Sequence, residues 1–197
     1  MLMLLVFFTQ LILPLTGQDQ NSRFEAGPVF TATTLNYVLD YKLRLAGGRF
    51  VWNAMPRLSA EGSVLTNFSV PNTVTARDGG RAISAQFGPK FDMWRFRNLS
   101  VFLKFDSGFL TFSRTLRGII GPDFHVVTEW KVYPDLDFGG GLQIRVSHRL
   151  SLRGDFSDFL VFYRQAKVQD DLAGVTSVLP AYSQHNGSIS ASLLLRF

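Results

Sequence analysis

Apolar and polar residues alternate with a period of two along most of the chain after Arg23. In the first such stretch Phe24 and Phe30 fall on one face, whereas Glu25 and Val29 fall on the other. This period predicts β-strands with two chemically different faces, and no segment carries a convincing helical period. Eight strands are predicted, at residues 23–33, 47–54, 58–67, 82–91, 99–112, 136–146, 150–163 and 186–197.

The connections between these strands alternate strictly between short and long. Three short connections centre on Pro56, Arg95 and His148. The four long connections are polar and cover residues 34–46, 68–81, 113–135 and 164–185. An up-and-down barrel places alternate connections at opposite ends, and tight turns at one end with long loops at the other are typical of barrels that cross a membrane. The sequence therefore predicts an all-β fold, an eight-stranded antiparallel up-and-down transmembrane β-barrel.

A period of two does not say which face of a strand points inward. Apolar side chains fill a soluble barrel, whereas in a membrane barrel they face lipid and the lumen is polar. The polar faces carry five acids and five bases, namely Glu25, Arg49, Glu61, Lys90, Lys104, Asp106, Asp137, Arg145, Arg153 and Asp155. Inside a narrow lumen these residues would form a balanced ion-pair network that plugs the barrel. On a soluble, lipocalin-like barrel that binds a small ligand, they would be ordinary solvated charges.

The opposite faces are apolar and would meet acyl chains in a membrane barrel. Two predicted strands show this best, with Leu99, Val101, Leu103, Phe105 and Phe109 in one and Leu136, Phe138, Leu142, Ile144 and Val146 in the other. Aromatic residues gather near the predicted strand ends, at Phe24, Trp52, Phe91, Trp94 and Phe197 on the turn side and at Phe30, Phe68, Phe112, Phe162 and Tyr163 on the loop side. Two aromatic belts are expected at headgroup depth. Aromatic residues of a core at the strand ends are the alternative.

The segments RFEAG, GGRFVWNAMPRLSAEG, DFGGGLQIRVSHRLSLRGDF and QHNGSISASLLLRF carry a family resemblance. In this order they resemble the small eight-stranded barrels of the OmpA-type and porin-like outer-membrane β-barrel group. The resemblance implies an integral protein of the Gram-negative outer membrane, structural or active in surface interaction, with at most narrow solute conduction. It also implies that the closing strand, which ends at Phe197, is the signal for the barrel-insertion machinery.

The N-terminal segment divides the chain into an export signal and a barrel. Residues 1–13 are apolar over too few positions to span a bilayer, and a polar run at residues 18–22 follows. We therefore expect a signal peptide at residues 1–20 and an outer-membrane barrel domain at residues 21–197. A buried N-terminal strand or helix is the alternative.

Composition and charge narrow the range of partners. The chain has no cysteine, so disulfides and thiolate metal sites are excluded. The net charge of +5 comes from scattered bases without a nucleic-acid reader motif, so no nucleic-acid partner is expected. Bases in the long connections are instead candidates to contact lipopolysaccharide phosphates, alongside the outer-membrane lipid, and ordinary solvated loop charge is the commoner explanation. These bases are Lys42, Arg44, Arg77, Arg81, Arg114, Arg117, Lys131, Arg164 and Lys167. A monomer is expected.

Candidate catalytic residues are few. His148 lies beside Ser147 and Ser151, an arrangement partly similar to eight-stranded lipid A deacylases that use Ser, His and Glu on the barrel surface. Ser151 is three residues after His148 and past a turn, so we interpret His148 as a turn histidine at the periplasmic rim rather than a catalytic residue. The other two histidines, His125 and His185, are too isolated for a zinc site. We expect no cofactor, no metal and no enzymatic activity, and a barrel enzyme acting on outer-membrane lipid remains the alternative.

Overall fold

The computed structural model describes residues 22–35, 41–67, 78–120, 125–170 and 175–197. Eight strands form the barrel: β1 (Phe24–Leu35), β2 (Tyr41–Trp52), β3 (Leu58–Asn67), β4 (Asp78–Phe96), β5 (Leu99–Ile120), β6 (His125–Arg145), β7 (Leu150–Tyr163) and β10 (Tyr182–Arg196). Two short strands, β8 (Ala166–Asp170) and β9 (Val175–Leu179), form a hairpin between β7 and β10. The predicted export signal, residues 1–20, lies outside the described residues.

The barrel closes on itself through antiparallel pairing at every step. The strands follow the order β4-β3-β2-β1-β10-β7-β6-β5, and β4 also pairs with β5. At the junction of the first and last strands, Glu25 pairs with Arg196 and Phe30 pairs with Ala191. The chain ends meet there, because the amides of Phe24 and Phe197 each donate to the other residue's carbonyl at 3.1 and 3.0 Å. The predicted eight-stranded antiparallel barrel is confirmed.

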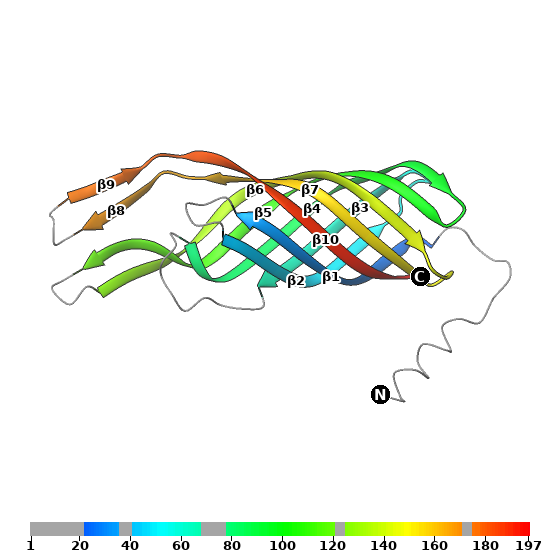
Figure 1. The fold of residues 1–197 in the computed structure, drawn as a ribbon, viewed down its shortest axis with the longest axis horizontal. Coiled ribbons are helices and arrows are strands. Elements are labelled where there is room, and N and C mark those ends of the chain that lie inside the picture. The colour runs from blue at the N-terminus through cyan, green and yellow to red at the C-terminus, as the bar shows by residue number, and fades with distance from the viewer. Residues whose placement is uncertain (1–21, 36–40, 68–77, 121–124, 171–174) are drawn as a thin grey trace, which may run out of the picture.

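The two ends of the barrel differ, as Figure 1 shows. Tight turns and the C-terminus lie at one end, whereas the β5–β6 and β8–β9 hairpins project beyond the barrel at the other. The prediction of plain polar loops at residues 113–135 and 164–185 was wrong, because paired strands satisfy much of this backbone. The connection predicted at residues 92–98 is also shorter, since β4 runs on to Phe96. We call the end with the tight turns and the C-terminus the turn end, and the end with the two projecting hairpins the hairpin end.

Apolar side chains point outward and charged side chains point inward. Leu195 and Phe105 are 53% and 46% exposed, whereas Glu61 and Lys104 are 2% and 3% exposed. A water-soluble barrel requires the reverse arrangement, so the lipocalin-like alternative is wrong. An outward apolar surface around a polar interior is the arrangement of a barrel immersed in lipid. The part of the chain that the structure describes contains no helix able to cross a bilayer.

The aromatic residues follow the prediction at one end and depart from it at the other. All five predicted on the turn side are exposed. On the hairpin side Phe30 and Phe162 are exposed, but Phe112 and Tyr163 are buried inside the barrel. They pack in a core of buried apolar residues, which consists of Val29, Leu43, Leu45, Leu65, Ala82, Leu110, Phe112, Tyr133, Phe159, Val161 and Tyr163. Phe68 lies outside the described residues. The lumen is therefore not polar throughout, because buried apolar residues gather toward its hairpin end.

Inward-facing glycines make the lumen wide enough for the charged side chains of the turn half. A Cβ on Gly141 would stand 2.0 Å from the Gly154 carbonyl oxygen and 2.9 Å from the Phe102 ring. A Cβ on Gly88 would stand 2.7 Å from Asp106 Oδ1. The glycines of the GGG segment, residues 139–141, thus mark close approach of neighbouring strands, which is how glycine is used within sheets.

Candidate functional site

The structure places nine of the ten predicted lumen residues inside the barrel. Each of the nine is at most 5% exposed. They are Glu25, Arg49, Glu61, Lys90, Lys104, Asp106, Asp137, Arg153 and Asp155. The exception is Arg145, which ends β6 and lies half-buried at the turn-end rim. Among the described residues, no acid lies within ion-pair distance of Arg145.

The centre of the lumen is bridged by Arg153. Its two terminal nitrogens donate to the two carboxylate oxygens of Glu61 at 2.5 and 2.9 Å, and its Nε donates to Asp155 Oδ1 at 2.6 Å. Glu61 lies on β3 and Arg153 on β7, which are four strands apart in either direction around the barrel. The pair therefore spans the full width of the lumen. Bidentate arginine–carboxylate pairs of this kind are strong and geometrically specific.

Two further side chains complete the bridge. Arg49 Nη1 donates to Asp155 Oδ2 at 2.5 Å and to Ser192 Oγ at 3.0 Å. On the other side, the guanidinium carbon of Arg153 lies 4.1 Å from the centre of the Phe102 ring. A guanidinium over an aromatic face is a favourable cation–π contact. Four charged side chains and one aromatic ring therefore meet in the lumen at this level.

Toward the hairpin end a second layer is rich in acid. Lys104 donates to Asp106 at 3.1 Å and to Asp137 at 2.5 Å, and Gln86 donates to Asp135 at 3.2 Å. One carboxylate oxygen of each of these three aspartates has no hydrogen-bond partner within the described part of the chain. The buried charges of the described residues number seven acids and five bases. Arg95, which is more exposed and pairs with Asp92, and the half-buried Arg145 are outside this count, so the predicted balance of the lumen network stays a prediction. Uncompensated buried charge is costly, so this layer is the less stable one.

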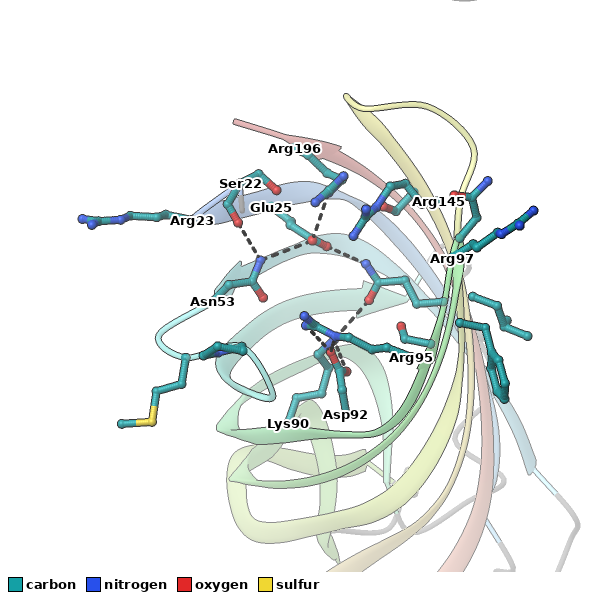
Figure 2. Close-up of a pocket in the computed structure, with 18 of the residues that line it drawn as sticks. Ser22, Arg23, Glu25, Asn53, Lys90, Asp92, Arg95, Arg97, Arg145 and Arg196 are labelled. Carbon is teal, nitrogen blue, oxygen red and sulfur yellow. Dashed lines mark hydrogen bonds and ion pairs between the residues drawn. The ribbon is translucent and has the colours of Figure 1, made fainter. Parts of the chain in front are cut away.

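The turn end of the lumen opens into a cavity of about 250 Å³, shown in Figure 2. Glu25 lies at its centre and accepts hydrogen bonds from Asn53 at 3.3 Å, Gln143 at 2.8 Å and Arg196 at 3.4 Å. Figure 2 shows Asp92 below it, held by Lys90 and Arg95. Both acids of the cavity are therefore already neutralised by protein partners.

Four of these side chains were not among the predicted lumen residues. Asp92 and Asp135 fall at positions that the sequence pattern assigned to connections, and a register shift between Asp92 and Trp94 hides the inward position of Asp92. Arg196 follows the inward alternation of the closing strand, so the same period of two could have found it. Gln143 also lies on the inward face of β6, but amides carry no charge signal.

His148 and Ser151 do not form at the turn end the catalytic arrangement that the enzyme alternative requires. His148 is exposed in the turn, whereas Ser151 points inward and is buried. A different pair forms on the outer surface, where His185 Nδ1 on β10 lies 2.6 Å from Asp158 Oδ2 on β7. Ser183 is two residues before His185 and is exposed on the same face. Within the described ranges no group of His, Asp and Glu side chains could hold a metal ion.

Among the comparisons with known proteins, the likeness to a solved structure supports the fold. No family model matches the chain, and no curated protein matches it. Neisserial surface protein A is similar in structure, with a TM-score of 0.60 and 12% identity over 89% of this chain and 98% of that one. Ail, the attachment invasion locus protein of Yersinia pestis, aligns with a TM-score of 0.47 and 13% identity over 88% of this chain and 96% of that one. The closed barrel, its outward apolar surface and the first of these likenesses together give the chain the fold of a small outer-membrane β-barrel.

Proposed function

We propose that this chain is an integral outer-membrane protein with a sealed lumen and a structural or surface-interaction role. The observation that carries the proposal is the Arg153–Glu61 pair, which joins opposite walls of the barrel. A second seal lies toward the hairpin end, where the Tyr133 and Tyr163 rings are 4.7 Å apart and the Tyr163 and Tyr182 rings are 4.8 Å apart. A polar and an apolar layer in series support a lumen that is closed to solutes.

Planar-bilayer recording of the refolded full chain tests the sealed lumen. We expect a flat current, without discrete steps of nanosiemens size. The matched variants are Arg153→Ala with Glu61→Ala, which empties the central bridge, and Leu195→Ala, which shortens an outward side chain. The current through the lumen variant should show brief openings at most, because the tyrosine layer remains. The current recorded with the outward variant should be the same as with the parent. Stable open steps in the parent protein would contradict the sealed lumen.

A surface role is supported by the hairpin end. The β5–β6 and β8–β9 hairpins project beyond the barrel, where an external partner could reach them (Figure 1). Arg44, Arg81 and Arg164 are exposed toward this end and are suited to contact lipopolysaccharide phosphates. The structurally similar neisserial protein is itself described as a surface protein. Replacing the three arginines by glutamine should weaken association with lipopolysaccharide vesicles and leave heat-modifiable gel migration unchanged.

The closing strand is proposed to engage the barrel-insertion machinery through its last residue. Phe197 is exposed, and its ring centre lies 6.3 Å from that of Phe24 at the barrel junction. Deleting Phe197 should therefore lower assembly in cells while leaving refolding into detergent intact. Equal assembly of both forms in cells would remove this role. A monomer in the membrane, with export directed by residues 1–20, completes the proposal.

A lipid-directed enzyme is the second candidate, favoured by one observation. The His185–Asp158 pair has the geometry of a histidine oriented by an acid, with its other ring nitrogen available to act as a base. Ser183 lies on the same outward face of β10, two residues before His185. A change in lipid A mass on expression of the parent, lost in Ser183→Ala and in His185→Asn, would establish this activity. An unchanged lipid A profile would leave the non-enzymatic role.

A further inference from the structure

The turn-end cavity carries more positive charge than its own acids can neutralise. Six basic and two acidic side chains line it. The bases are Arg23, Lys90, Arg95, Arg97, Arg145 and Arg196, and the acids are Glu25 and Asp92. Figure 2 shows Arg23 and Arg97 extending away from the cavity, so four bases face two acids across it. An excess of two positive charges therefore remains inside a confined, partly buried space.

The excess is concentrated at Arg145. Lys90 and Arg95 both donate to Asp92, and Arg196 donates to Glu25. Arg145 has no ion pair within the described part of the chain, and the charges near it are two bases, Arg196 and Arg95, and one acid, Glu25. Figure 2 shows Arg145 and Arg196 at the same edge of the cavity. Two guanidinium groups that share one acid, Glu25, still leave one positive charge over, and an anion would stabilise this arrangement.

A neutral hydroxyl adds an independent sign of a ligand. Ser151 pairs with Arg145 across the β6–β7 ladder and lines the same cavity. Its side chain is buried, with the residue only 1% exposed, and its Oγ has no hydrogen-bond partner among the described residues. A buried hydroxyl without a partner costs about 1–3 kcal/mol, so such groups usually find one. A bound oxyanion would accept the hydroxyl hydrogen bond and neutralise the two arginines at once.

We propose that the turn-end cavity is a binding site for a phosphate group, held by Arg145 and Arg196 with the hydroxyl of Ser151 as a third donor. Arginine suits this task because its planar fork matches the oxygens of phosphate in a bidentate manner. In an outer-membrane barrel the turn end faces the periplasm. The phosphate is therefore either a free periplasmic anion or the headgroup of a phospholipid in the inner leaflet.

The test is titration of the refolded full chain in a zwitterionic detergent with inorganic phosphate, at low chloride, followed by calorimetry. We expect saturable one-to-one binding. Arg145→Gln should weaken it at least about tenfold, since one charge-assisted bidentate contact is worth roughly 1.5–3 kcal/mol. Ser151→Ala should weaken it by a smaller factor. The matched control is Arg97→Gln, which removes the same charge from the same rim but from a side chain that points away from the cavity.

Repeating the titration in nanodiscs distinguishes the two sources of phosphate. If inorganic phosphate still binds in discs of phosphatidylglycerol, the site takes the free anion. If binding is lost there but present in detergent, a lipid headgroup occupies the site. Either result supports the proposal. Equal weakening by Arg97→Gln and Arg145→Gln would reveal only diffuse electrostatic attraction and would overturn it, as would absence of saturation. All variants must still fold, as judged by heat-modifiable gel migration. Arg145→Gln should pass this check, because the substitution breaks no ion pair.

Discussion

Removing Arg153 is the most informative perturbation of the lumen. Arg153→Gln deletes three charge-assisted hydrogen bonds, two to Glu61 and one to Asp155, and a cation–π contact with Phe102. Each such bond is worth roughly 1.5–3 kcal/mol, but they share one side chain and do not add. Asp155 also keeps its bond to Arg49. Glu61 alone is left buried without a cation, a condition that typically costs about 3–5 kcal/mol.

We therefore expect Arg153→Gln to lower the free energy of unfolding by about 3–5 kcal/mol. Glu61→Gln should cost less, because Arg153 retains Asp155. Replacing both by apolar residues, Arg153→Met with Glu61→Leu, should recover much of the loss, since an intact apolar pair leaves no unpaired charge. The assay is reversible urea unfolding in detergent or vesicles, followed by tryptophan fluorescence and by gel mobility. Arg153→Gln with Glu61→Gln completes a double-mutant cycle with the two single variants, and a coupling energy below about 0.5 kcal/mol in that cycle would refute the bridge as a structural unit.

Three further outcomes follow from the geometry. Gly141→Ala should prevent normal folding, because its Cβ meets backbone at 2.0 Å, whereas Gly48→Ala, with nothing within 4 Å, should stay within about 0.5 kcal/mol of the parent in urea unfolding. Asp135→Asn should be neutral or stabilising in the same assay, because it reduces the acid excess around Lys104; a loss above about 1 kcal/mol would contradict that account. Phe138→Arg, on the lipid face, should cost about 2–4 kcal/mol in vesicles, and no cost there would place this face outside the bilayer core.

The strand pattern was readable because a barrel wall is the simplest case of a two-faced strand. Each inward residue contacts the lumen and each outward residue contacts lipid, so chemistry and direction change together every residue. All ten predicted lumen residues follow this alternation, and nine of them are buried. Arg145 obeys the same alternation but lies at the last position of β6, where the lumen meets solvent. Alternation gives the direction of a side chain but not its depth.

The wrong predictions concern where side chains lie within the barrel. Phe112 and Tyr163 are aromatic residues near strand ends, as expected of an aromatic belt. They nevertheless point inward and belong to the apolar core toward the hairpin end. The sequence could not show this, because an apolar residue on an inward face breaks the expected alternation of polar and apolar positions. It therefore reads as an outward residue. Asp92 and Asp135 were assigned to connections because turn-like residues surround them. Only the pairing of long strands through these positions shows that both carboxylates lie in the lumen.

The sequence by itself determined the strand period, the direction of most side chains and the alternation of turns and long connections, because each depends on residues that are neighbours along the chain. Which charges meet was decided only by closure of the barrel. Glu61 and Arg153 are 92 residues apart and form an ion pair because their strands lie opposite each other around the ring. The isolation of Arg145 beside Arg196 has the same origin. Both depend on strand order and stagger, which are properties of the closed sheet and of no single strand.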